Sequence, residues 1–210
     1  MASCSITDWI IAVATCIGAL SVLYAARQAT LLKEQISADH ERSRRQVAVD
    51  LIWRFTELMS GTAATDFVEG LATEVVRSIV NCESTVVRID ERQQNALRVC
   101  LKGTSLVVPQ IGEVTLSRDI VGTVQTDALR YLSIVESVLL AWLHNVADRK
   151  MIEDQLAYLF DATKGRNCLK AFRAAAGGAR IFPATAAFEL ELAKRVEDRL
   201  EGRSPIGVAV

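Results

Sequence analysis

The sequence is poor in the residues that build metal and nucleophilic sites. It has only two histidines, His40 and His144, and they are not spaced as metal ligands on one helix face. It contains no phosphate-binding glycine loop, no paired-histidine zinc motif and no serine-nucleophile elbow. Its five cysteines are scattered and include no C-x-x-C pair, as expected for thiols in a reducing compartment. We therefore expect no metal, no cofactor and no catalytic activity.

The sequence also lacks an excess of charge of either sign. The formal net charge is −1 at pH 7, so nothing indicates a surface for nucleic acid. Three prolines among 210 residues, together with abundant Ala, Leu, Val, Arg and Glu, favour helices over sheet. The expected fold class is all-α.

The longest uncharged run lies near the N-terminus. The eighteen residues from Trp9 to Ala26 carry no formal charge, and as a helix they would span roughly 27 Å, close to the hydrocarbon thickness of a bilayer. Residues 1–8 contain no Lys or Arg, so a cleaved signal peptide does not fit. We predict an uncleaved single-pass transmembrane helix over 9–26, and a buried core helix is the open alternative.

The charges that flank this run predict its orientation. Asp8 is the only charge before it, whereas Arg27, Lys33 and an arginine cluster at 42–45 follow. Because positive residues stay on the cytoplasmic side, we expect the N-terminus outside and the body inside a bacterial inner membrane.

A stripe of small residues runs along the predicted membrane helix. Its members fall at i, i+4, i+7 and i+11, a spacing that lets two membrane helices approach closely. They are Ala14, Gly18, Ser21 and Ala25. We predict that this stripe supports helix packing, while the frequency of small residues in membrane helices is the alternative explanation.

The remainder of the chain divides into four predicted segments. Residues 1–8 form a short extracytoplasmic tail, and 27–46 form a charged juxtamembrane stalk that continues the membrane helix. Apolar residues at helical spacing then predict a cytoplasmic bundle of about six helices over 47–201, followed by a flexible tail at 202–210. The expected helices cover about 48–59, 64–80, 86–102, 126–145, 148–164, a segment ending near 177, and one that follows Pro183.

Two features of this bundle stand out in the sequence. The stretch at about 104–122 is rich in Val, Gly and Thr and has no helical period, which predicts an irregular loop or short hairpin where a partner could bind. The helix over 126–145 is the most hydrophobic one and should be central.

Glu136 is the one acidic residue on the apolar side of that central helix. A buried carboxylate needs a partner, and the basic residues of the first core helix, Arg45 and Arg54, are candidates. The structural interpretation is an interhelical ion pair. The functional interpretation is a ligand or proton site that Tyr131 would help to line.

Two motifs resemble a known family. One is Arg-Arg-Gln-Val-Ala-Val-Asp-Leu-Ile-Trp-Arg-Phe over 44–55, and the other is the Tyr-Leu-x-x-x-Glu core that begins at Tyr131. Together with the predicted membrane helix they resemble a family of small bacterial membrane-anchored proteins whose helical domain has no assigned function. Val49 and Ser133 depart from the Thr and Asn of the family pattern. The resemblance implies an anchored helical domain and brings no activity with it.

These observations favour a non-catalytic, single-pass inner-membrane protein that presents a cytoplasmic helical domain. Its expected partners are the lipid bilayer and a second protein or another copy of itself, with no nucleic acid. The alternative is a membrane-linked sensor or effector that binds a small ligand in the bundle near Glu136.

Overall fold

The computed structural model describes residues 6–59, 63–161, 163 and 166–200, without the side chains of 6–8, 10–14, 16–17, 19 and 199–200. The chain forms two compact units, residues 1–44 and residues 45–210. The predicted tail at 202–210 and most of the predicted tail at 1–8 lie outside the described residues.

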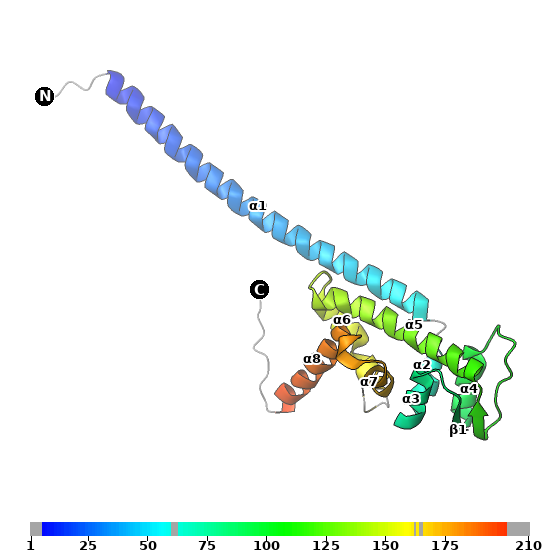
Figure 1. Cartoon of the computed structure of the whole chain (residues 1–210). Coiled ribbons are helices and arrows are strands. Elements are labelled where there is room, and N and C mark those ends of the chain that lie inside the picture. Colours follow the sequence, from blue (N-terminus) through cyan, green and yellow to red (C-terminus); the bar gives the residue numbers. More distant parts are fainter. Residues whose placement is uncertain (1–5, 60–62, 162, 164–165, 201–210) are drawn as a thin grey trace. The chain divides into compact units, whose positions relative to one another are not determined.

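The N-terminal element is the long helix α1, Ile6–Met59, whose 54 residues run without interruption (Figure 1). No proline occurs in this range, and its last glycine is Gly18, so nothing in the sequence breaks the backbone hydrogen-bond ladder. Every residue from 20 to 46 is exposed. Among the residues whose side chains are described, no helix is both long and apolar enough to cross a membrane.

The second unit is mostly helical, which confirms the broad fold class. The described residues form seven further α-helices, two short 3-10 helices and a two-stranded sheet. The helices are α2 (Ala64–Val68), α3 (Thr73–Val80), α4 (Glu91–Cys100), α5 (Arg118–Leu143), α6 (Arg149–Leu156), α7 (Lys170–Ala175) and α8 (Pro183–Leu200). The 3-10 helices are η1 (Ala157–Phe160) and η3 (Gly178–Arg180), and the strands are β1 (Thr85–Ile89) and β2 (Gly112–Leu116).

Helix α5 is the central element, as its hydrophobicity predicts. Eleven of its side chains are buried, and it packs against α2, α3, α4, α6 and α8. It begins at Arg118, earlier than the predicted start near 126, because the Ser117 hydroxyl accepts a bond from the Ile120 amide and caps the extra turns. Gly122 lies inside these turns next to Cys82, whose sulfur would be in ordinary van der Waals contact, at 3.5 Å, with a Cβ at this position.

The predicted helix over 86–102 is wrong at its start. Residues 85–89 form strand β1, which pairs antiparallel with β2 so that Thr85 lies opposite Leu116 and Ile89 opposite Gly112. Val and Ile at these positions favour a strand. Asp90 then starts α4 with a capping box, in which it accepts from the Gln93 amide while the Gln93 side chain accepts from the Asp90 amide.

The stretch at 104–122, predicted as an irregular loop or short hairpin, is irregular over 104–111 and contains strand β2 at 112–116. The partner strand is β1 and not a neighbouring segment of the same stretch, and residues 118–122 belong to α5. The predicted helix over 64–80 is also divided, since residues 69–72 separate α2 from α3 and include Gly70.

Candidate functional site

The site that the sequence proposes around Glu136 is a junction between two helices. Glu136 is buried on α5 with 8% of its surface exposed, which confirms the predicted burial. Its Oε1 accepts from the Ala184 amide at 2.7 Å, and its Oε2 accepts from the Thr185 amide at 2.9 Å and from the Thr185 hydroxyl. All three donors belong to the first turn of α8.

These contacts satisfy the amide groups that α8 leaves open at its start. Pro183 has no N–H, and the Ala186 amide makes the first intrahelical bond, to the carbonyl of Phe182. The two remaining amides, of Ala184 and Thr185, both donate to Glu136. Because the N-terminus of a helix carries positive partial charge, it stabilises an ionised carboxylate without a basic side chain.

The partners predicted for Glu136 lie elsewhere. Arg45 Nε is 3.6 Å from Asp148, which also caps α6 by accepting from the Met151 amide. Arg54 is exposed on α1. An interhelical contact of Glu136 is present as expected, but backbone amides take the place of the predicted arginine because Ala184 and Thr185, which follow Pro183, offer N–H groups without an intrahelical acceptor.

Tyr131, the other predicted member of this site, contacts a different group. It is buried on α5, and its hydroxyl lies 4.0 Å from the Cys168 sulfur. Burial, followed by the neighbouring Cys168, raises the pKa of Tyr131 far above its ordinary value. Burial also raises the pKa of Cys168 to about 12, so this thiol stays protonated at physiological pH and is a poor nucleophile.

A second buried carboxylate, Glu153, joins α5, α6 and α8. Its Oε1 accepts from the Trp142 indole N–H at 2.7 Å, and its Oε2 lies 2.8 Å from an Arg195 nitrogen. Arg149 lies over the Trp142 ring, with its guanidinium carbon 4.3 Å from the ring centre. Both oxygens of Glu153 are thus engaged by the protein itself.

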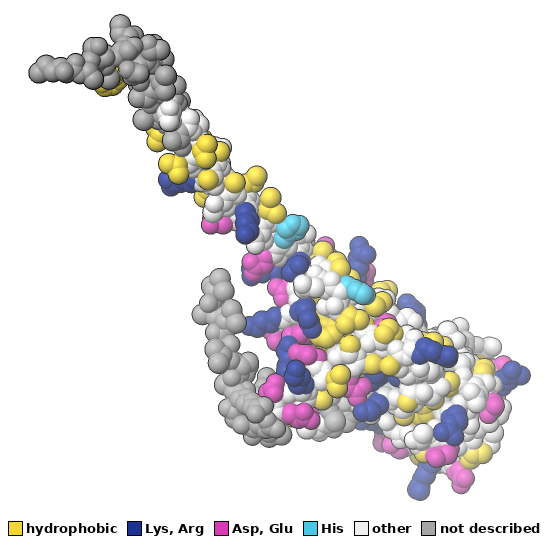
Figure 2. Space-filling model, turned by 60° about the vertical axis from the view of Figure 1, so that its left-hand side comes forward, with side chains coloured by type: hydrophobic (Ala, Val, Ile, Leu, Met, Phe, Trp, Pro, Cys, Tyr) yellow, Lys and Arg dark blue, Asp and Glu magenta, His cyan; other side chains and the backbone are white. Residues whose placement is uncertain are grey.

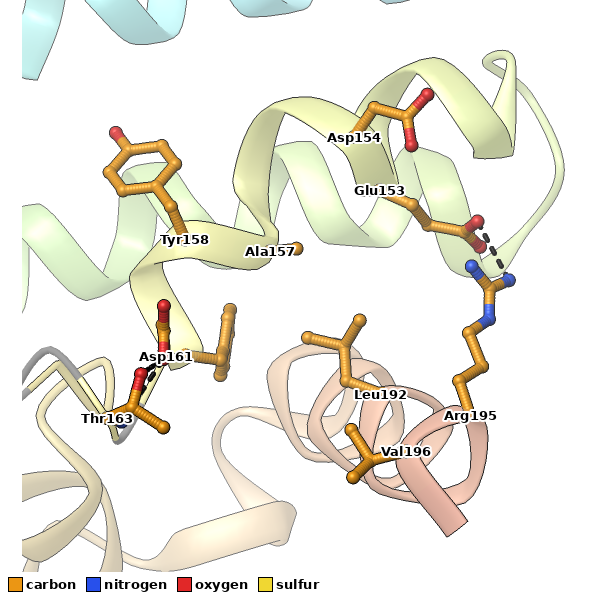
Figure 3. A pocket seen from close by; sticks show the side chains of 10 residues that line it. Glu153, Asp154, Ala157, Tyr158, Asp161, Thr163, Leu192, Arg195 and Val196 are labelled. Atoms are coloured by element: carbon orange, nitrogen blue, oxygen red, sulfur yellow. Dashed lines mark hydrogen bonds and ion pairs between the residues drawn. The ribbon is translucent and has the colours of Figure 1, made fainter. Parts of the chain in front are cut away.

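A hollow of about 640 Å³ opens beside Glu153 (Figure 3). Its walls come from α6, η1 and α8, and they combine acidic side chains with an apolar floor. Two pairs of polar groups on its walls contact each other, since Glu153 binds Arg195 and Asp161 accepts bonds from Thr163 (Figure 3). The volume suits a small molecule, and Asp154 and Tyr158 also line the hollow.

A third carboxylate, Glu189 of α8, is held by two cations. Lys170 Nζ is 2.7 Å from its Oε1, and a nitrogen of the buried Arg173 is 2.8 Å from its Oε2. Partial burial acts to raise the pKa of Glu189, but the hydrogen bonds from Lys170 and Arg173 outweigh it and lower the pKa below the ordinary 4.5.

The turn before α7 has an unusual backbone conformation, which is held by hydrogen bonds with Glu69 and Arg173. Cys168 and Leu169 both have positive φ, 49° and 54°, which costs energy for residues other than glycine. Glu69 Oε1 accepts from the Leu169 amide, and Arg173 Nε donates to the Cys168 carbonyl at 2.9 Å. The side chains of Glu69, which directly follows α2, and of Arg173 on α7 therefore hold this turn in place.

The interior of the described part has no polar group left without a partner. Every buried side-chain nitrogen or oxygen among the described residues makes a hydrogen bond. In the same residues, no group of three or more His, Cys, Asp or Glu side chains could hold a metal ion. The buried carboxylates therefore act as connections between helices.

The predicted packing stripe lies on α1. Gly18, Ser21 and Ala25 are exposed there, and the side chain of Ala14 lies outside the described set. Large apolar side chains are exposed on the same part of the helix, including Val22 and Leu23 (Figure 2). This surface and the Glu136 junction belong to different units of the chain.

Sequence reasoning missed Glu153, Arg173 and Thr185 as buried polar residues. One signal could have predicted the role of Thr185. Pro183 marks the first turn of a helix, yet the preceding Phe182 has no side-chain acceptor, so the cap has to come from another element. No comparable signal marks Glu153, because its neighbours in the sequence are ordinary for an amphipathic helix.

The fold places the chain among mostly helical proteins, and its first helix is unusually long. No protein-family model, no curated protein and no solved structure matches the chain. The resemblance suggested by the two sequence motifs therefore stays a prediction.

Proposed function

We propose that this chain is a non-catalytic, single-pass inner-membrane protein that presents a cytoplasmic helical domain for protein–protein interaction or self-association. The observation that carries the proposal is the uncharged run from Trp9 to Ala26, which lies within one continuous helix. Part of this run lies outside the described side chains, and the proposal rests on its sequence.

The exposed side chains of the run support a non-aqueous environment. Leu20, Val22, Leu23 and Tyr24 are each at least 65% exposed. Transfer of a fully exposed Leu or Val side chain from water to an apolar environment lowers the free energy by about 1.5–3 kcal/mol. Several such side chains on one helix therefore favour its contact with lipid or with a partner protein. The basic residues that follow, beginning with Arg27, support a cytoplasmic location for the second unit.

The interior of the second unit supports interaction over catalysis. Its buried carboxylates are occupied by helix amides and by arginines, and burial raises the pKa of the Cys100 thiol to about 11. By contrast, Val49 and Trp53 are large, exposed and one helical turn apart on α1, with Trp53 72% exposed. Exposed apolar groups of this kind are typical of contact surfaces.

The ligand-sensor alternative has less support. It requires a group near Glu136 that can bind a small molecule, and both oxygens of Glu136 accept bonds from α8. A ligand would have to displace the cap of a helix.

The anchor is tested by washing membranes of cells that express the full chain with alkaline carbonate. We expect the wild type to stay in the pellet. Gly18→Arg with Val22→Arg should move most of the protein to the supernatant, because each arginine inside a bilayer costs about 2.5–3.5 kcal/mol. Leu32→Arg with Ile36→Arg has the same spacing outside the run and should stay in the pellet.

Release of the wild type by carbonate would contradict the anchor, and so would equal behaviour of the two double variants.

The interaction is tested on full-length protein purified from membranes in mild detergent, with the particle mass measured. A defined oligomer or a stoichiometric second protein supports the proposal, and a monomer alone contradicts it.

A further inference from the structure

A regular apolar seam runs along the N-terminal part of α1 and continues past the predicted membrane segment. Its members alternate at spacings of four and three residues, the heptad pattern of helices that pack side by side. They are Gly18, Val22, Ala25, Ala29, Leu32 and Ile36. The seam shares Gly18 and Ala25 with the predicted small-residue stripe but extends ten residues beyond Ala26, into the charged segment.

The seam has no cover within the described residues of its unit. All six positions are exposed, and the two largest, Leu32 and Ile36, are 57% and 50% exposed. Figure 2 shows hydrophobic side chains on this part of α1 next to charged ones. Beyond Ala26 a bilayer does not account for Leu32 and Ile36, because this segment also carries Arg27, Lys33 and Glu34.

The charges are arranged as a parallel pair of identical helices requires. Arg27, Glu34 and Glu41 recur every seven residues on the side opposite the seam, where they face water. The positions that flank the seam would place Gln28 beside Lys33 of the second helix, and Gln35 beside His40. These flanking pairs join a polar group with a basic one, and no like charges meet.

The end of the seam is also marked by charge. The next position of the pattern is Asp39, and the one after it is Ser43. Two Asp39 carboxylates would face each other in a parallel pair, which opposes further pairing. The seam therefore occupies residues 18–36, roughly 28 Å of helix.

We infer that a second copy of this chain covers the seam, with the two helices parallel and in register. The parallel direction rests on the proposed membrane anchor, which gives both copies the same orientation. Gly18, Ala25 and Ala29 allow close approach of the two backbones, as in membrane helix pairs. The larger side chains of Val22, Leu32 and Ile36 occupy the other seam positions, where they would pack between the two helices.

The test compares two adjacent leucines in the full-length protein. Leu32 lies in the seam, whereas Leu31 lies beside it and has a similar exposure, 52% against 57%. Sedimentation equilibrium in mild detergent gives the dimer dissociation constant. Leu32→Glu should raise it at least about 100-fold, because each copy loses a buried leucine and two carboxylates meet, while Leu31→Glu should change it by less than about threefold.

A second variant tests the apolar part of the seam. Gly18→Ile adds a large side chain where the two backbones approach, and it should raise the dissociation constant at least about tenfold. A monomeric wild type, or equal effects of Leu32→Glu and Leu31→Glu, would overturn the inference. A chain that carbonate leaves in the membrane and that purifies as one copy bound to a second protein contradicts the seam alone, and a dimer that carbonate releases contradicts the anchor alone.

Discussion

Single carboxylates hold together helices that are far apart in the sequence. Glu136 on α5 binds the first turn of α8, 48 and 49 residues later in the chain, and Glu153 on α6 binds Arg195 of α8. Each replaces water with a complete set of donors, which is the condition for burying a charge without a large penalty. These residues define the packing of α8 more specifically than apolar contacts can.

The role of Glu136 is tested by Glu136→Gln, which keeps the size of the side chain. Gln keeps one acceptor oxygen and replaces the other by an NH₂ group, which would face the N–H of Ala184 or of Thr185 with donor against donor. We therefore expect the free energy of unfolding to fall by about 1–3 kcal/mol. Urea denaturation of the full chain in detergent measures this free energy of unfolding for the wild type and the variant.

The adjacent exposed residue provides the control. The Ser137 hydroxyl bonds only to the carbonyl of Ser133 on its own helix, so Ser137→Ala should change the free energy of unfolding by less than about 0.5 kcal/mol. Equal stability of Glu136→Gln and the wild type would show that the cap contributes little.

At the scale of elements, α7 and α8 are joined by the contacts of Glu189 with Lys170 and Arg173. Because folding lowers the pKa of Glu189, this carboxylate stabilises the fold above its unfolded pKa, near 4.5, and the stabilisation is lost as the pH falls through the lower folded pKa. We expect the melting temperature to decline below about pH 4.5.

The variant Glu189→Gln isolates this contribution. It should be less stable than the wild type at pH 7 and should lose less stability on acidification. Glu197→Gln, at an exposed position of the same helix, serves as the control and should follow the wild-type profile. Parallel profiles for the wild type and Glu189→Gln would contradict the account.

The elements differ in how far the sequence predicts them. The uninterrupted α1 follows from a long segment without proline, and the central α5 follows from its long apolar face. Strand β1 was missed because Val86, Val87 and Ile89 also fit a helical face, and only pairing with β2 selects the strand. The partner of Glu136 was missed because periodicity shows which side of a helix is apolar and does not show which helix lies opposite.

At the scale of the whole molecule, we propose different tasks for the two units. The first unit presents an uncharged run and a heptad seam, for which we propose a bilayer and a second copy of the chain. In the described part of the second unit, the buried polar side-chain atoms all have partners, and apolar residues such as Trp53 are exposed. The proposed function needs both units, because the first one localises the contact surface of the second.

The measurement that tests this central claim most directly is the topology of the full chain in bacterial cells. A reporter that is active only in the cytoplasm is fused after Val210, and a second fusion carries a reporter that is active only in the periplasm. The basic residues after Ala26 predict that only the cytoplasmic reporter is active and that it sediments with the inner membrane. Periplasmic activity, or a cytoplasmic reporter in the soluble fraction, would contradict the account.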